Sequence, residues 1–337
     1  VGNGLPARER PAVVHTIHGP PFMPVEGAPA RRAKVRAANL AYTLAERFAA
    51  KRCHTIVSVA DAMTTQFLAR GIGRPERYIT VRSGMDTHAF LHAAPGEDRA
   101  AMRAALGLSV NGGEGKGDFV VGTVARLAQH KGHDDLLDAL GPAMRENAAL
   151  KLLWVGDGWW RERLVARART MGLGVAELDR APGASTHPAA PDAGSSRTTT
   201  QAPQVLLTGL VPPQRVPAMM RAMDVLAHPS YREGLPRTVP QALLCGVPVV
   251  AYDCDGTGEI CRHEPAERAT GRLVPTGDVP ALREALLWML SHPAERAAMA
   301  ARGREECAAA YSTEAMIAGL ERVYAGALAA ARRGPAA

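Results

Sequence analysis

The stretch Ser230–Val250, SYREGLPRTVPQALLCGVPVV, orders a carboxylate, a glycine turn, a short helix and a buried strand along the chain. Glu233 stands directly before Gly234, and a helical pattern follows. Val247–Ala251 is an apolar run typical of a buried parallel strand. This order puts an acid and several unpaired backbone N–H groups at a helix N-terminus, on the rim of a sheet. Such a position can hold a sugar hydroxyl and a phosphate together.

Apolar strands alternate with helical patterns along most of the chain. The expected strands are Val13–Ile17, Thr55–Val59, Tyr78–Val81, Phe119–Ala125, Leu150–Val155, Val205–Thr208, Asp224–His228 and Val247–Ala251. The main expected helices lie at residues 31–52, 134–140, 160–170, 216–223 and 313–331. Strands and helices that alternate at this spacing predict an α/β fold with doubly wound parallel sheets.

A chain of 337 residues, 47% of them apolar, suits two α/β domains. We expect a partial N-terminal domain at 1–106, a linker at 107–117, a C-terminal domain at 118–311 with a flexible surface insertion at 180–202, and a final helix at 312–337 that packs back toward the N-terminal domain. The chain starts with Val1 rather than Met and soon enters a buried strand. We therefore expect the N-terminal domain to be incomplete, with upstream strands absent from this sequence.

The net charge of +7 is compatible with nucleic acid, an anionic membrane surface or a phosphate-bearing small molecule. No basic run is interleaved with aromatic residues, which disfavours nucleic acid. The five cysteines form no CxxC pair, as is typical of free thiols in a reducing cytoplasm. No apolar run of about twenty residues is present, so the sequence predicts no membrane span. A cytoplasmic location is the expectation.

Seven short motifs together resemble the glycosyltransferase family 4 group, which has the GT-B architecture of two Rossmann-like domains facing across a cleft. In chain order they are His15–Gly19, Ile56–Ala60, Val81–Asp86, Gly122–Leu127 with Lys131 and Gly132, Val155–Gly158, Leu207–Val211, and Glu233–Pro236 with Ala242–Val249. Each motif alone is a weak signal. Seven in the family's order, covering nearly the whole chain except residues 180–202, are specific.

This resemblance implies an enzyme that moves a sugar from a nucleoside-diphosphate sugar to an acceptor hydroxyl with retention. The family context is the synthesis of polysaccharides, glycolipids or other glycoconjugates, with a sugar or lipid-linked acceptor. It implies no cofactor and no metal, because cationic side chains neutralise the diphosphate. Front-face transfer, in which the leaving phosphate takes the acceptor proton, is inherited from the resemblance as well.

By the same resemblance, Arg126 and Lys131 clamp the diphosphate, and Glu233 holds hydroxyls of the donor sugar. The backbone N–H groups of Gly234 and Leu235 add hydrogen bonds to the donor. The alternatives are a solvated basic loop for the two cations and a plain helix N-terminal carboxylate for Glu233. Fixed cations at a leaving group that gains negative charge lower the barrier, which favours the catalytic interpretation.

Three further donor contacts are expected from the family pattern. Val211 lies where the family's backbone meets the nucleobase. Gln241 replaces the usual second glutamate, eight residues after Glu233, so we expect weaker ribose binding because one acceptor oxygen and the charge are lost. Glu259 either bonds the sugar or braces its own loop.

His18 occupies the loop in which a family histidine approaches the donor sugar; the alternative is a structural histidine bonded to a carbonyl. Asp253-Cys254-Asp255 resembles the metal-binding Asp-x-Asp of the other large glycosyltransferase architecture, but the better interpretation is a tight turn. Core packing is the favoured role for Trp159 and Trp160, with base stacking as the alternative.

The basic helix at residues 31–52 carries Val35, Ala38, Leu40, Leu44 and Phe48 at helical spacing. Ordinary core packing is the favoured interpretation, and peripheral contact with an anionic membrane is the sharper alternative. Two rival functions also stay open. One is a sugar-nucleotide epimerase of GT-B fold, and the other is a non-catalytic sugar-nucleotide-binding protein.

Overall fold

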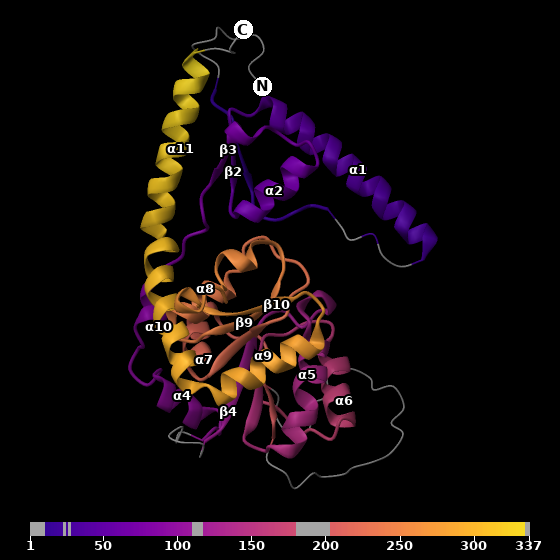
Figure 1. Cartoon of the computed structure of the whole chain (residues 1–337), viewed down its shortest axis with the longest axis vertical. Coiled ribbons are helices and arrows are strands. Elements are labelled where there is room, and N and C mark those ends of the chain that lie inside the picture. Colours follow the sequence, from indigo (N-terminus) through magenta and orange to yellow (C-terminus); the bar gives the residue numbers. More distant parts are fainter. Residues whose placement is uncertain (1–10, 23–24, 26–27, 110–116, 180–202, 334–337) are drawn as a thin grey trace.

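The computed structural model describes residues 11–22, 25, 28–109, 117–179 and 203–333. These residues form two α/β domains, each built around its own parallel sheet (Figure 1). The flexible insertion expected at 180–202 lies outside the described residues. The α/β fold with parallel sheets confirms the expected fold class.

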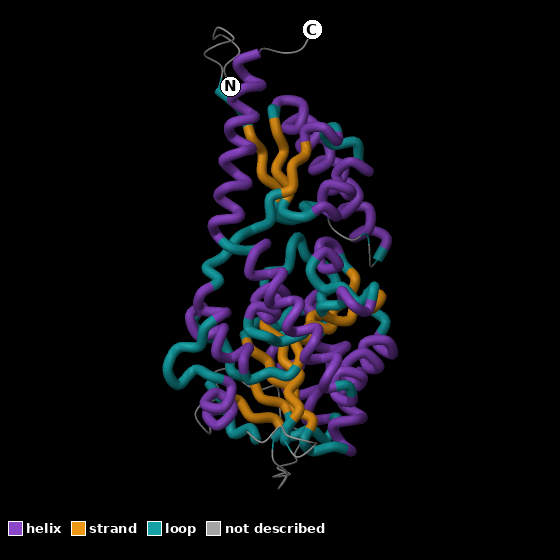
Figure 2. The backbone as a smooth tube through the Cα atoms, turned by 60° about the vertical axis from the view of Figure 1, so that its left-hand side comes forward, coloured by secondary structure: helices purple, strands orange, loops and turns teal. Residues whose placement is uncertain are grey.

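The N-terminal domain has a three-stranded parallel sheet in the order β1-β2-β3. Helices α1 and α2 cover one face and α11 covers the other (Figure 2). The bounds are β1 Val14–Ile17, β2 Thr55–Ser58, β3 Tyr78–Thr80, α1 Pro29–Arg52, α2 Asp61–Ala69 and α11 Thr313–Arg333. Alternate residues of β2 serve the two faces: Ile56 packs with Phe67 of α2, whereas Val57 packs with Val323 of α11.

The C-terminal domain has a seven-stranded parallel sheet in the order β10-β9-β8-β4-β5-β7-β6. The strands are β4 Phe119–Val124, β5 Leu150–Val155, β6 Val175–Glu177, β7 Val205–Leu207, β8 Val225–His228, β9 Val249–Asp253 and β10 Gly271–Pro275. Strand β4 lies between β5 and β8, so the winding direction reverses there. Ligands of such sheets bind outside the carboxyl ends of the strands at this switch point.

Helices cover both faces of this larger sheet, and consecutive residues of β4 serve the two cores. Val121 lies in the core beneath α5, α6 and α9, and Val120 in the core beneath α4, α7 and α8. The helices are α3 His88–Leu91, α4 Arg99–Ala105, α5 His133–Glu146, α6 Arg161–Thr170, α7 Val216–Arg221, α8 Thr238–Leu244, α9 Val279–Ser291 and α10 Pro293–Ala310. Both faces are thus apolar, which is why the strands read as continuous hydrophobic runs.

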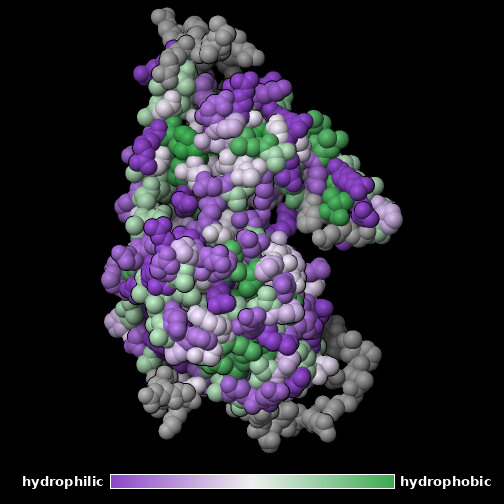
Figure 3. Space-filling view, viewed as in Figure 1, coloured by the Kyte–Doolittle hydropathy of each residue, from purple (hydrophilic) through white to green (hydrophobic). Residues whose placement is uncertain are grey.

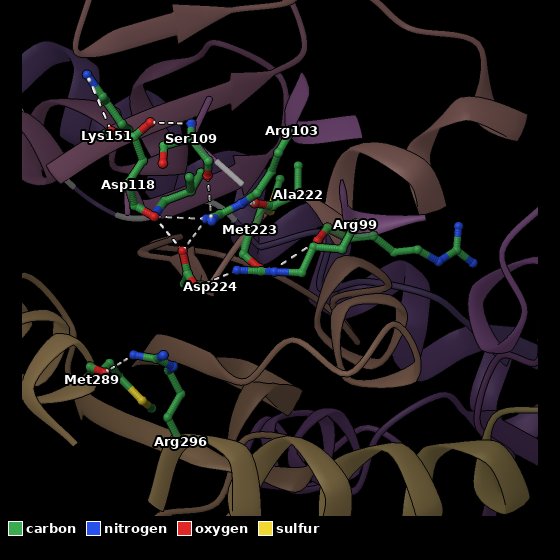
Figure 4. Close-up of polar contacts among 12 residues, drawn as sticks. Arg99, Arg103, Ser109, Asp118, Lys151, Ala222, Met223, Asp224, Met289 and Arg296 are labelled. Carbon is green, nitrogen blue, oxygen red and sulfur yellow. Dashed lines mark hydrogen bonds and ion pairs between the residues drawn. The ribbon is translucent and has the colours of Figure 1, made fainter. Parts of the chain in front are cut away.

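The boundary between the domains differs from the one expected at residue 106. Met102 of α4 packs in the C-terminal core, and Arg103 is only 1% exposed. Arg103 and Arg99 both pair with Asp224, at 2.5 and 2.6 Å, as Figure 4 shows. The Val120 amide donates to the same carboxylate at 2.8 Å. Residues 99–105, which the sequence places in the N-terminal domain, are therefore a packed part of the C-terminal domain, because Arg103 is buried against Asp224.

Helix α1 contradicts the expectation of ordinary core packing for most of its large apolar residues. Leu40, Leu44 and Phe48 are 60%, 54% and 59% exposed, whereas Val35 is half-buried and Ala50 is buried. The helix projects from the small sheet and leaves one side uncovered (Figures 1 and 3). Among the described helices, none combines the length and the apolar character that a membrane crossing requires.

Candidate functional site

The loops that follow β4 and β8 meet at the switch point of the large sheet. Gly132 has a φ of 67°, and a Cβ added to it would lie 2.0 Å from the carbonyl oxygen of Pro229. The Ser230 hydroxyl and the Tyr231 amide both donate to the carbonyl of His130, at 3.2 and 2.9 Å. The two loops are therefore in direct backbone contact, which only a glycine at position 132 allows.

This contact brings Lys131 and Glu233 together. Lys131 Nζ lies 2.5 Å from Glu233 Oε1, and the two side chains are only 19% and 14% exposed. His228 Nε2 lies 3.2 Å from the same oxygen, a close contact that lacks hydrogen-bond geometry. Two of the three residues that the sequence analysis placed around the diphosphate and the sugar are thus in contact.

The electrostatics of the pair keep Glu233 ionised. Burial would raise the pKa of Glu233, but His228 and Lys131 outweigh it and lower that pKa to about 2. The pKa of His130 is lowered, chiefly by burial and by the charge of Lys131. Arg232 and Arg126 lower this pKa further, whereas Glu233 raises it. Among the described residues, no hydrogen bond or ion pair joins the guanidinium of Arg126 to Glu233.

Arg126 itself is exposed just beyond β4, with its guanidinium 5.6 Å from the ring centroid of Trp159. Trp159 is 67% exposed, so the expectation that it packs in the core is wrong. Trp160 does pack against the core and lies under Arg163. The difference arises because Trp159 stands on the turn that leaves β5, whereas Trp160 opens α6.

The N-terminal domain reaches the Glu233 loop through the segment after β1. A Cβ on Gly234 would lie 2.2 Å from the carbonyl oxygen of His18. Arg232 donates to the carbonyls of Pro20 and Phe22, at 3.2 and 2.9 Å. The exposed His18 therefore belongs to a loop that abuts the Glu233 loop, although no hydrogen bond or ion pair joins its imidazole to Glu233 among the described residues.

The other expected donor contacts are more scattered. Within the described chain the amides of Gly234 and Leu235 donate no hydrogen bond, and both residues are half-buried. Gln241 is half-buried on α8, one turn after Thr238, whose hydroxyl is 3.3 Å from His228 Nδ1. Val211 is half-buried beyond β7, next to the strongly exposed Leu210.

Glu259 faces the N-terminal domain with both carboxylate oxygens. Oε1 accepts from the amide of Ala62 at 2.9 Å, and Oε2 lies 3.3 Å from the guanidinium of Arg82. This arrangement favours the bracing alternative for Glu259, and its contact with a donor stays a prediction. Among the described residues, no group of three or more His, Cys, Asp or Glu side chains is arranged to hold a metal.

Sequence reasoning missed three residues that contact this site. His228 ends β8, so its place at the carboxyl edge of the sheet was the available signal. Asp255 accepts from the Glu233 amide at 2.7 Å, and Gln66 donates to Asp255 at 2.6 Å. No local pattern links these partners, because Gln66 and Asp255 are 189 residues apart.

The fold and the switch-point site define a two-domain α/β protein of the GT-B type. Residues 196–306 match the family described as "Glycosyl transferases group 1". The solved structure of Anabaena HepE in complex with UDP superposes with a TM-score of 0.66 and 20% identity, over 93% of this chain and 72% of that one. At that identity the likeness shows the fold alone.

Curated relatives agree with the family match. The 2-deoxystreptamine glucosyltransferase of Streptomyces kanamyceticus is 29% identical over 264 residues, which are 78% of this chain and 58% of that protein. A GDP-mannose-dependent monoacylated alpha-(1-6)-phosphatidylinositol monomannoside mannosyltransferase of Corynebacterium glutamicum is 29% identical over 241 residues, 69% of this chain and 52% of that protein. The chain thus spans about half the length of these relatives. Together the matches support the glycosyltransferase group 1 family.

Proposed function

We propose that the protein is a glycosyltransferase that moves a sugar from a nucleoside-diphosphate sugar to an acceptor hydroxyl with retention, in the synthesis of a polysaccharide, glycolipid or other glycoconjugate. The observation that carries the proposal is the half-buried Lys131–Glu233 pair at the switch point. It presents a cation and an ionised acid side by side, where the N-terminal domain meets the sheet. The glycosyltransferase relatives make sugar transfer the favoured chemistry for this site.

In this mechanism Lys131 and Arg126 neutralise the diphosphate as the bond between the anomeric carbon and the phosphate oxygen breaks. Glu233 accepts hydrogen bonds from donor-sugar hydroxyls, and the Gly234 and Leu235 amides donate to donor oxygens. The acceptor oxygen bonds to the anomeric carbon on the face that the phosphate leaves. The acceptor proton passes to the leaving phosphate, so atoms and charges balance without a nucleophile from the protein.

The test is sugar transfer from UDP-glucose and GDP-mannose, measured with Lys131→Ala and Arg126→Ala variants. Each variant is expected to lower turnover about a hundredfold, the scale of losing one charge-stabilising donor. Arg163→Ala is the matched control, since Arg163 also lies over a tryptophan but outside the site. Near-normal turnover in both site variants would contradict the proposal.

The same assay separates the rival functions and tests the need for a metal. Product analysis that finds an altered sugar still on the nucleotide would indicate an epimerase. Binding of the nucleotide sugar without any product would indicate a non-catalytic protein. We further expect turnover to survive EDTA, because side-chain cations supply the charge that a metal would supply; abolition by EDTA would overturn this part.

We also propose a cytoplasmic protein that touches the inner face of an anionic membrane through α1 and takes a sugar or lipid-linked acceptor. The helix carries seven basic residues and one acid, Glu46, whose carboxylate lies 3.2 Å from His15. Leu40, Leu44 and Phe48 follow one another at intervals of four, so they share a face. The buried Ala50 and half-buried Thr43 lie on another face. An exposed apolar stripe flanked by cations is typical of an interfacial helix.

Co-sedimentation with vesicles tests this contact. The parent chain is expected to bind phosphatidylglycerol-containing vesicles, to bind less as salt rises, and to ignore phosphatidylcholine alone. A Leu44→Asp, Phe48→Asp variant should lose binding at least about tenfold. Leu328→Asp on α11 is the matched control, since Leu328 is 50% exposed and Leu44 is 54% exposed. Equal binding by the variant and the control would contradict the contact and favour a protein segment as the occupant of this stripe.

A further inference from the structure

The first residue of the turn η5, Asp255–Glu259, has a backbone conformation that is energetically unfavourable for an L-residue. Asp255 has a φ of 46°, and among the described residues it is the one non-glycine residue with a positive φ. L-residues other than glycine avoid this region, although Asp tolerates it better than most. A non-glycine residue with such a strained backbone indicates that its side chain has a role.

The carboxylate of Asp255 joins two parts of the molecule. Its Oδ2 accepts from the backbone N–H of Glu233 at 2.7 Å. Its Oδ1 accepts from the side-chain amide of Gln66, on α2 of the N-terminal domain, at 2.6 Å. One carboxylate therefore bridges the residue that we assign to the donor sugar and the opposite domain.

The rest of the turn is held between the same two partners. The Gly256 amide donates to the carbonyl of Gly234 at 3.1 Å. A Cβ on Gly256 would lie 2.7 Å from that carbonyl oxygen and 2.8 Å from Cβ of Ala60 in the N-terminal domain. At the far end of the turn, Glu259 binds Ala62 and Arg82. The turn thus has hydrogen bonds to the Glu233 loop on one side and to α2 and Arg82 on the other.

We infer that Asp255 is a positioning residue that fixes Glu233 through its backbone and couples that position to contact between the domains through Gln66. With the domains together, Gln66 holds one carboxylate oxygen, so the other stays on the Glu233 amide. When the domains separate, the carboxylate loses its outer partner and can rotate away. This inference rests on the proposed function, because it treats Glu233 as the group that binds the donor sugar.

The experiment compares binding of a nucleotide sugar with binding of the free nucleotide, by calorimetry, in three variants. The probe is whichever of UDP-glucose and GDP-mannose the parent chain binds more tightly, with UDP or GDP as its partner. Asp255→Gly removes both hydrogen bonds and keeps the backbone, since glycine accepts a φ of 46°. Asp255→Asn keeps an acceptor for the Glu233 amide, and the Gln66 amide can turn to accept from the new side chain.

Asp255→Gly is expected to weaken binding of the nucleotide sugar about tenfold, while affinity for the free nucleotide changes less than about twofold and Tm does not fall. Asp255→Asn should restore sugar binding to within about threefold of the parent. Gln66→Ala should weaken binding of the nucleotide sugar by less than Asp255→Gly does. The double variant Gln66→Ala, Asp255→Gly should bind the nucleotide sugar as tightly as Asp255→Gly alone.

Two results would overturn the inference. One is unchanged affinity for the nucleotide sugar in Asp255→Gly. The other is an equal loss for sugar and free nucleotide together with a lower Tm, which a merely structural turn would give. Failure of the proposed function looks different, because the parent chain would then bind neither nucleotide sugar, or would bind one without transferring its sugar to an acceptor.

Discussion

Glu233 shows how burial and charge oppose each other at a single residue. Burial alone would favour the protonated acid, and it is the largest single influence on this side chain. Lys131 and His228 together outweigh it, so the carboxylate is ionised at neutral pH. An ionised acid that is mostly buried and already paired is ready to accept hydrogen bonds from a ligand without first losing a proton.

The low pKa of Glu233 predicts a pH dependence of stability. Its ordinary pKa of 4.5 falls to about 2 in the fold, so the contribution is fully present above about pH 4.5 and is lost as the pH falls toward 2. The stabilisation at neutral pH is at most about 3 kcal/mol by linkage. In urea unfolding, Glu233→Gln should lower the free energy of unfolding at pH 7 and flatten its decline between pH 5 and 2.

The control for this measurement is Glu305→Gln, which changes an exposed carboxylate on α10. This variant should keep the pH dependence of the parent chain. Parallel curves for the parent and Glu233→Gln would show that Glu233 is not the titrating group.

At the residue scale, the sequence pointed to Glu233 because it stands directly before a glycine turn, and to Lys131 because of the resemblance to the glycosyltransferase family 4 group. Their contact follows from topology, since β4 and β8 are neighbours and their carboxyl ends share one edge. The bridge from Gln66 to Asp255 was beyond prediction. It depends on how two separate domains dock, and neither residue carries a local pattern that names its partner.

At the scale of elements, the strands of the large sheet were predicted best where both faces are buried, as in β4 and β5. Strand β6, Val175–Glu177, was missed because Val175 is its one large apolar residue, so it shows no apolar run. Strand β10, Gly271–Pro275, was missed because glycine, arginine and proline interrupt its apolar pattern. Helix α1 was predicted, but periodicity alone cannot tell an apolar face that packs from one that faces solvent.

The loop between β4 and α5 makes a prediction at the same scale. Gly132→Ala should destabilise the fold by about 2 kcal/mol or more, because alanine is strained at a φ of 67° and its Cβ would meet the Pro229 carbonyl. The same displacement should move Lys131 away from Glu233 and weaken nucleotide-sugar binding. Thermal unfolding and calorimetry measure the two effects.

Gly246→Ala is the control for this experiment, because it adds the strain of a positive φ without a steric contact. Gly246 has a φ of 74°, and nothing lies within 4 Å of an added Cβ there. Gly246→Ala should therefore lower the free energy of unfolding by only about 1 kcal/mol, the cost of a positive φ for alanine, and should leave ligand binding intact. Equal losses in the two variants would contradict the contact between the two loops.

At the scale of the whole molecule, the two domains are joined by more than one covalent crossing. Helix α11 starts beside the C-terminal domain and packs on the small sheet through Val323. The α3–α4 segment is held to the large sheet by paired arginines, including the buried Arg103 (Figure 4). Composition placed the domain boundary too late in the chain, because charged residues indicate solvent exposure only when no buried partner is available.

These connections leave the Glu233 loop as a shared surface of both domains. Its Arg232 binds carbonyls of the N-terminal domain, and the neighbouring turn binds Gln66, Ala62 and Arg82. A ligand bound by Glu233 therefore lies at the contact between the two domains, so a movement of one domain relative to the other would alter its surroundings.

The most direct test of the central claim is a crystal structure with an intact nucleotide sugar, UDP-glucose or GDP-mannose, bound to the chain. We predict diphosphate oxygens within hydrogen-bond distance of Lys131 and Arg126, and a sugar hydroxyl on the Glu233 carboxylate. A diphosphate bound elsewhere, with Lys131 and Glu233 still paired only to each other, would contradict the account.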